Sequence, residues 1–144
     1  MSLKEIDRRV LITLELEKAA KTWGQMEVQV NNGVWEMAAN RLYYALFHAV
    51  SALLISDLHE VGTHRGAVNQ FSLYYIKTGI FTKDEGRLYS NLQKLREDGD
   101  YNCYIDVDQK DVEPFIEPTR QLIEKIKQYV TERTKSLTDE ELSQ

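Results

Sequence analysis

Residues 38–54 read AANRLYYALFHAVSALL, and this stretch decides the fold. It lies within a longer segment, about Val34 to Asp57, in which two neighbouring faces of a helix are apolar. One face carries Leu42, Leu46, Ala49 and Leu53, and the next carries Tyr43, Phe47, Val50 and Leu54. A helix that is apolar on most sides is buried on most sides. The stretch therefore predicts a long helix at the centre of a helical bundle.

The segments on both sides of this central helix predict more helices and no strand. No run alternates between polar and apolar residues as a half-buried strand would. The turn Asn31–Gly33 can adopt a positive φ at low cost, which predicts a tight helical hairpin. Helical spacing of apolar residues predicts the other helices over about residues 4–30, 63–78, 83–96 and 111–135. The predicted fold class is all-α, an antiparallel up-and-down bundle of four to five helices.

The last of these helices contains both prolines of the chain. Asp111 is the expected cap, and Pro114 fits the opening turn because the first amides of a helix have no partner to lose. Pro118 either lies inside the helix, kinking it at a cost of about 3 kcal/mol, or marks the point where the regular helix begins. The segment before this helix, Glu97–Asp108, is polar and is expected to be a connecting loop.

Length and charge limit the classes of protein that the chain can represent. Its 144 residues are enough for one domain, predicted over residues 1–135, with a disordered acidic tail over 136–144. The formal net charge of −5 argues against broad, sequence-blind binding of nucleic acid, so any RNA contact would be local. We expect a cytoplasmic protein with no membrane association. The chain has a lone cysteine, Cys103, and shows neither a signal-peptide pattern nor a long apolar run.

The three histidines do not form a recognisable metal motif, and no cofactor motif is present. His48 shares one side of the central helix with Arg41 and Tyr44. These three polar side chains either face a cleft or are buried, with hydrogen bonds to their polar atoms. His64 begins the third helix, where it has a structural role or helps to hold an anion at the free backbone amides. His59 is expected to be exposed on a loop.

The most informative polar segment is LREDGDY, residues 95–101. Arg96 is expected to end the fourth helix, and the acidic residues after it are expected to fold back as a loop that carries Tyr101. In one interpretation Arg96 pairs with Asp100 as a structural clamp. In the other the same residues form a functional site.

Together these motifs resemble HEPN proteins of the RxxxDY type. The resemblance implies a bundle of four or five antiparallel helices, usually a homodimer, with a polar cleft where the second and fourth helices of two subunits meet. It also implies a partner, since family members often act beside a minimal nucleotidyltransferase as a toxin and antitoxin pair, and many cut RNA without metal. The resemblance rests on residues 38–49, Ala52-Leu53-Leu54, His64, Lys77-Thr78-Gly79, Arg96 and Asp100-Tyr101.

In the family's ribonucleases, four to six residues separate the arginine from a histidine, which moves a proton while the arginine stabilises phosphate charge. Arg96 matches the arginine, but Tyr101, Asn102 or Cys103 occupies the place of the histidine. A tyrosine with a pKa of about 10 is a poor base at neutral pH. Efficient cleavage of RNA is therefore not implied.

The sequence leaves two functional hypotheses from different classes open. A third possibility is a purely structural dimer. The first is a homodimeric binding module for a nucleotide, RNA or a nucleotidyltransferase. The second is a metal-independent ribonuclease toxin in which Arg96 holds the phosphate and His48 or His64 replaces the missing histidine. The expected cleft is lined by Arg41, Tyr44, His48, His64, Arg96, Asp100 and Tyr101.

Overall fold

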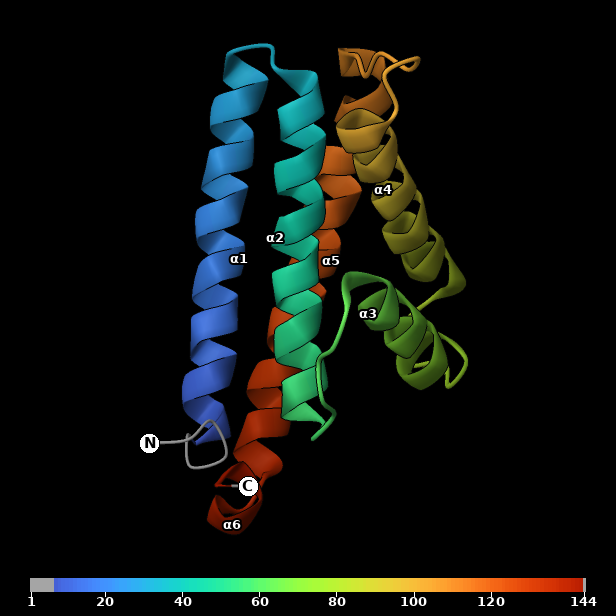
Figure 1. Ribbon diagram of the computed structural model, residues 1–144. Helices are drawn as coiled ribbons and strands as arrows, with labels where there is room; N and C mark the ends of the chain where they lie inside the picture. The colour runs from blue at the N-terminus through green and yellow to red at the C-terminus, as the bar shows by residue number, and fades with distance from the viewer. Residues whose placement is uncertain (1–6, 144) are drawn as a thin grey trace.

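A computed structural model describes residues 7–143, and it is built from helices with no strand among those residues (Figure 1). The predicted all-α bundle is therefore confirmed. None of the described helices is long and apolar enough to cross a membrane. The elements are α1 (Arg8–Asn31), α2 (Trp35–Ser56), α3 (His64–Phe71), the π-helical turn η2 (Ser72–Ile76), α4 (Lys83–Tyr101), α5 (Gln109–Ser136) and α6 (Asp139–Leu142).

The first two helices form the predicted hairpin. The Asp7 carboxylate accepts a hydrogen bond from the Arg9 amide at 2.7 Å and caps the start of α1. The predicted start near Lys4 lies outside the described residues. Gly33 has a φ of 72°, a conformation that costs glycine little, and it turns the chain into α2. The turn predicted from Asn31–Gly33 is confirmed.

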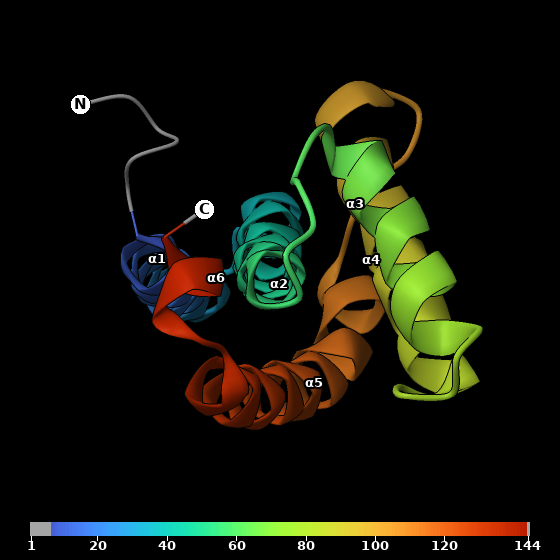
Figure 2. The same ribbon diagram turned by 90° about the horizontal axis from the view of Figure 1, so that it is seen from below.

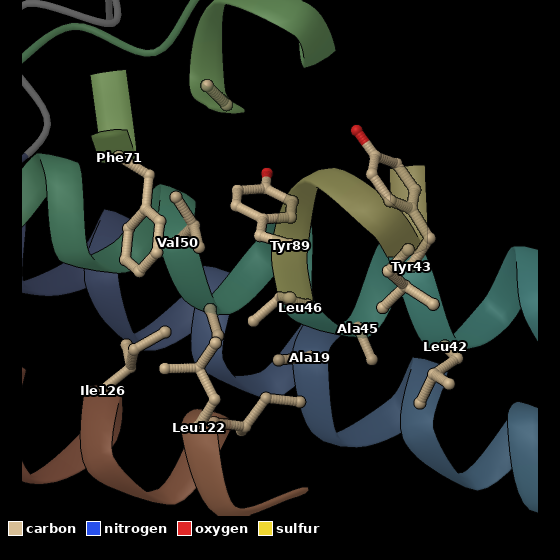
Figure 3. Close-up of a cluster of buried hydrophobic side chains, with 14 of the residues drawn as sticks. Ala19, Leu42, Tyr43, Ala45, Leu46, Val50, Phe71, Tyr89, Leu122 and Ile126 are labelled. Carbon is tan, nitrogen blue, oxygen red and sulfur yellow. The ribbon is translucent and has the colours of Figure 1, made fainter. Parts of the chain in front are cut away.

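The central position of α2 is also confirmed, because α1, α3, α4 and α5 all pack against it. Figure 3 shows part of the core, where Leu46 of α2 lies among side chains of other helices. Ala19 of α1, Tyr89 of α4 and Leu122 of α5 contribute to this cluster and are almost fully buried. Two apolar faces on α2 thus hold the helices on either side of it together.

The third predicted helix is divided. Thr63 caps α3 as expected, since its hydroxyl accepts a hydrogen bond from the Gly66 amide at 2.9 Å. After Phe71 the backbone continues as the π-helical turn η2 and stops at Gly79, whose φ is 80°. The predicted span of about residues 63–78 is therefore helical, but its last part has the wider π geometry.

The predicted end of α4 at Arg96 is wrong, because the helix continues to Tyr101. Gly99 explains the extension: a Cβ placed on it would lie 3.4 Å from Val107 and 3.9 Å from the Glu36 carbonyl oxygen. The end of α4 therefore packs closely on the start of α2, and this contact overrides the weak helix propensity of the local sequence. Asp100 consequently lies one helical turn beyond Arg96 rather than on a returning loop.

The expected start of α5 is wrong by about one turn. Asp108 is the cap, and Asp111 is the third helical residue, whose carboxylate accepts a hydrogen bond from the Asp108 amide at 2.9 Å. Pro114 and Pro118 both lie inside the helix rather than at its opening. Figure 2 shows that α5 curves along its length. The buried apolar face of α5 continues past both prolines and offsets the backbone hydrogen bonds that they remove.

Residues 136–143 differ from the expected disordered tail. Thr138 and Glu141 form a capping box at the start of α6. Leu137 is 8% exposed and Leu142 is 2% exposed. This segment is acidic in composition, but it contains two leucines. Their burial attaches its described part to the bundle.

A buried carboxylate ties three elements together at the end of α2. Asp57 accepts hydrogen bonds from the Tyr75 hydroxyl at 2.7 Å, the Tyr129 hydroxyl at 2.8 Å and Arg133 Nε at 2.7 Å. Its side chain is only 15% exposed. The proximity of this carboxylate joins burial in raising the pKa of Tyr129 to about 12, so the tyrosine remains a donor at neutral pH.

We expect Asp57→Ala to lower the free energy of unfolding by several kcal/mol, because each donor left without a partner costs about 1–3 kcal/mol. Chemical denaturation at pH 7 measures the effect. Glu60→Ala is the matched control, since its side chain is on the neighbouring exposed loop. Equal stability of the two variants would show that the Asp57 cluster does not hold α2, η2 and α5 together.

Candidate functional site

The candidate site is built around Arg96 of α4, whose residue is only 6% exposed. Its guanidinium carbon lies 4.8 Å from the ring centre of Tyr43 and 5.6 Å from that of Tyr44, both on α2. The ring of Tyr101, from the last turn of α4, lies at 5.8 Å. These distances allow cation–π attraction, which grows when the cation is desolvated. Three tyrosines therefore surround the guanidinium on an otherwise apolar helix contact.

The hydrogen-bonding capacity of Arg96 is largely unused. Asp100 approaches Nη1 at 3.5 Å, and the Tyr101 hydroxyl accepts from the same nitrogen at 3.5 Å, so both contacts are long. Nε is buried and has no hydrogen-bond partner in the part of the chain that the structure describes. Burial alone would lower the pKa of Arg96, but Tyr44, Tyr43 and Asp100 outweigh it and the pKa is raised. The side chain is thus a buried cation whose Nη1 contacts are long and whose Nε–H has no partner among residues 7–143.

Asn40 connects this arginine with a second one. Its amide nitrogen donates to Asp100 Oδ2 at 3.1 Å, and its carbonyl oxygen accepts from Arg41 Nε at 2.9 Å and Nη2 at 2.7 Å. Arg41 also donates to Gln25 Oε1 on α1 at 3.1 Å, and it lies 5.2 Å from the ring centre of Tyr44. A polar chain therefore runs from α1 through α2 to α4.

Sequence reasoning did not single out Asn40, although it lies directly before Arg41 in the decisive stretch. The available signal was its position four residues before Tyr44, which places both side chains on one side of α2. Its role depends on Asp100, and the wrong end predicted for α4 concealed that contact.

His64 joins the site from the start of α3. Its ring centre lies 4.4 Å from that of Phe47 and 5.2 Å from that of Tyr44. Partial burial and the positive charge of Arg96, with a smaller contribution from His48, lower the pKa of His64 below its usual value. The imidazole is therefore neutral at pH 7 while lying beside a buried cation.

His48 lies apart from the arginine centre. Its Nδ1 is 2.8 Å from Glu15 Oε2 on α1, and both side chains are partly buried. Its ring is next to that of Phe47, at 5.4 Å between centres. The structure thus brings Arg41, Tyr44, His64, Asp100 and Tyr101 together around Arg96, and it places His48 at the margin. Among residues 7–143, no three His, Cys, Asp or Glu side chains gather closely enough to hold a metal ion.

The core next to Arg96 contains the hydroxyl groups of Tyr43 and Tyr89. Tyr43 and Tyr89 are fully buried, their ring centres are 6.1 Å apart, and neither hydroxyl has a hydrogen-bond partner in the described structure. Figure 3 shows both hydroxyls pointing to the same side of the core. Burial raises the pKa of both groups, so they remain neutral donors. The floor of the site is accordingly polar but uncharged.

These features define a class of protein: a helical bundle in which a buried arginine is followed one turn later by aspartate and tyrosine and is surrounded by tyrosines of the central helix. The model for the HEPN domain matches residues 13–129, and the chain belongs to this family. The resemblance drawn from the sequence motifs is confirmed.

Curated relatives cover nearly the whole chain. A UPF0332 protein of Thermotoga maritima is 28% identical over 128 residues, which covers 84% of this chain and 97% of that protein. Two proteins of Methanocaldococcus jannaschii, each named "Putative toxin", are 26% identical over 132 and 126 residues. Those alignments cover 90% and 88% of this chain and 90% and 93% of the relatives. The chain is thus similar to toxin-like members of the family.

We expect His64 to titrate below pH 6.5, and Arg96→Met to move its midpoint upward because the substitution removes the repelling charge. Proton NMR of the histidine Cε1–H signals between pH 4 and 8 measures both midpoints. Arg87→Met, on an exposed face of α4, is the control and should leave the midpoint unchanged. A wild-type midpoint at or above 6.5 would contradict the placement of His64 beside Arg96.

Proposed function

We propose that this protein is a dimeric binding module that holds a phosphate-bearing ligand, a nucleotide or an RNA segment, at Arg96. The observation that carries the proposal is the buried guanidinium with an unpaired Nε and two long contacts on Nη1. Guanidinium groups bind phosphate oxygens through parallel N–H donors, and such bonds are strong where water is excluded. A phosphate oxygen would replace the long contacts of Nη1, while the buried Nε–H lies behind it.

The surrounding groups suit the rest of such a ligand. Tyr101 is 77% exposed at the edge of the site, and an exposed ring can stack on a base. Arg41 and His64 flank Tyr44 and can contribute positive charge and a neutral donor or acceptor. The acidic net charge of the chain fits a local contact of this kind rather than a broad basic surface.

Exposed apolar residues near the site support the homodimer. They lie at the end of the bundle where α4 finishes and α2 begins, which Figure 1 shows as neighbouring. Contiguous exposed apolar surface is typical of a protein contact, and a second copy would close the site from outside. The residues are Val34, Met37, Tyr101, Tyr104 and Ile105, each at least 42% exposed.

The biological setting that we propose is a toxin–antitoxin-like pair with a nucleotidyltransferase partner. The family membership and the names of the two Methanocaldococcus relatives support the toxin side of this pairing. The nucleotidyltransferase follows from the resemblance to the family, and co-purification of the chain with the product of a neighbouring gene tests it.

A second candidate function, metal-independent cleavage of RNA, is favoured by one specific observation. His64 is neutral at pH 7 and shares the Tyr44 ring with Arg96. A neutral imidazole can accept a proton from a ribose hydroxyl while the arginine stabilises charge on the phosphate. His64 would then replace the histidine that the family's ribonucleases carry after their arginine. His48 is less suited to this role because it is bonded to Glu15.

We expect Arg96→Lys to weaken binding of ADP and of a 3′-phosphorylated RNA oligonucleotide by roughly tenfold to a hundredfold, because a hydrogen bond to a charged group contributes about 1.5–3 kcal/mol. Isothermal titration calorimetry measures the dissociation constants. Arg87→Lys makes the same substitution on an exposed part of α4 and should leave them unchanged. Absence of binding by the wild-type protein would reject the module.

If the protein is a ribonuclease, it should cut a mixed RNA pool in the presence of EDTA. His64→Gln should then abolish cutting without lowering the melting temperature, because the ring lies at the surface. His59→Gln serves as the control, since His59 stacks on Tyr74 away from Arg96. Cutting that survives His64→Gln, or no cutting by the wild-type protein, would remove this candidate.

A further inference from the structure

A groove runs between α1 and α5 on the side of α2 away from α3. Both helices pack on α2, and they make little direct contact with each other. Two hollows of about 240 and 600 Å³ lie along this groove. Their residues continue one stripe on each helix at steps of three and four, from Arg9 to Trp23 on α1 and from Arg120 to Lys135 on α5. The two hollows therefore belong to one groove.

The floor of the groove is apolar and its upper half is open. Ala19 and Ala20 leave room beside Trp23, which is half-buried, and Ile123 lies opposite on α5. Small residues next to a large aromatic ring make a hollow that another side chain can fill. The candidate functional site uses none of these residues.

The chain itself shows what this groove accepts. At the lower end, α6 crosses from α5 toward α1 (Figure 2), and Leu137, directly after α5, and Leu142 of α6 line the groove. Both leucines are buried, and the residues between them include Asp139, Glu140 and Glu141. The Asp139 carboxylate lies 3.7 Å from Arg9 of the groove wall. The resident occupant is thus a short acidic helix anchored by leucines.

The charge of the groove walls matches an acidic occupant along their whole length. The basic lining residues on α1 and α5 are Arg9, Arg120, Lys127 and Lys135, and the acidic one is Glu124. The net charge of these lining residues is therefore positive, whereas the formal net charge of the whole chain is −5. The ion pairs of Arg120 with Glu117 and of Lys127 with Glu124 are exposed. Exposed pairs contribute little, so a ligand carboxylate can replace them at low cost.

We propose that the open part of the groove binds an acidic amphipathic helix of a partner protein. Leucine-like side chains of that helix fill the hollow beside Trp23 and Ile123, and its carboxylates pair with Arg120 and Lys127. The open hollow runs from Arg120 to Lys127 on α5, about 11 Å at 1.5 Å per residue, which accommodates about two turns of a bound helix. This surface is separate from the Arg96 site and independent of the proposed function.

A synthetic helix tests the proposal. The probe is a fluorescein-labelled peptide of about fourteen residues, with leucines at i, i+4 and i+7 and glutamates on the outer face. A second peptide carries lysines in place of the glutamates. We expect fluorescence anisotropy to show saturable, micromolar binding of the acidic peptide alone, with a change in tryptophan emission. Lys127→Glu should weaken binding about tenfold or more, as expected for replacing an attraction by a repulsion.

Two further variants make the result decisive. Ala20→Trp fills the hollow from an exposed position and should also block binding, whereas Lys94→Glu, on an exposed face of α4, should leave it unchanged. Thermal melts identify any variant that fails to fold, in which case Lys127→Glu decides alone. No binding of the acidic peptide, equal binding of the basic one, or indifference to Lys127→Glu would overturn the proposal. The peptides carry no phosphate, so their failure leaves the Arg96 proposal untouched.

Discussion

The structure depends on holding one cation, the guanidinium of Arg96, between two packed helices. A buried charge is costly unless neighbouring groups compensate for it. Here the faces of Tyr43 and Tyr44 and the carboxylate of Asp100 supply that compensation. Asp100 can take part in this compensation only because α4 continues past Gly99 and packs on the start of α2. The contact between the end of α4 and the start of α2 thus positions the groups that compensate for the buried charge of Arg96.

The same arrangement gives the site its chemical character. The faces of the Tyr43 and Tyr44 rings stabilise the cation, and the Arg96 donors without a short contact are the ones that we propose bind an anion. Asn40 holds Asp100 and Arg41 in one polar chain and fixes the geometry from behind. Partial burial and, after it, the charge of Arg96 lower the pKa of His64. The binding and the acid–base chemistry that we propose would therefore share one physical source in this member of the HEPN domain family.

The sequence predicted the bundle well, because the apolar faces of α2 leave few alternatives to a buried central helix. Helical spacing placed Arg41 and Tyr44 on one side of the central helix, and Arg96 came from the resemblance to the family motif; the structure places these three residues close together. The sequence prediction failed where tertiary contact decides the outcome. Gly99 between two aspartates favours a loop by local propensity, yet packing against Glu36 keeps it helical. The roles of Asn40 and of Glu15, which holds His48 away from the arginine, depend on contacts between helices distant in sequence.

We propose that the donors of Arg96 form an anion site inside the aromatic enclosure. The most direct measurement is the ¹H–¹⁵N NMR signal of Arg96 Nε, assigned by comparison with Arg96→Lys, during a titration with inorganic phosphate. The account predicts a signal protected from exchange that shifts in a saturable manner as phosphate binds, while the Arg87 signal does not move. An Arg96 signal that exchanges rapidly with water and is indifferent to phosphate would contradict it.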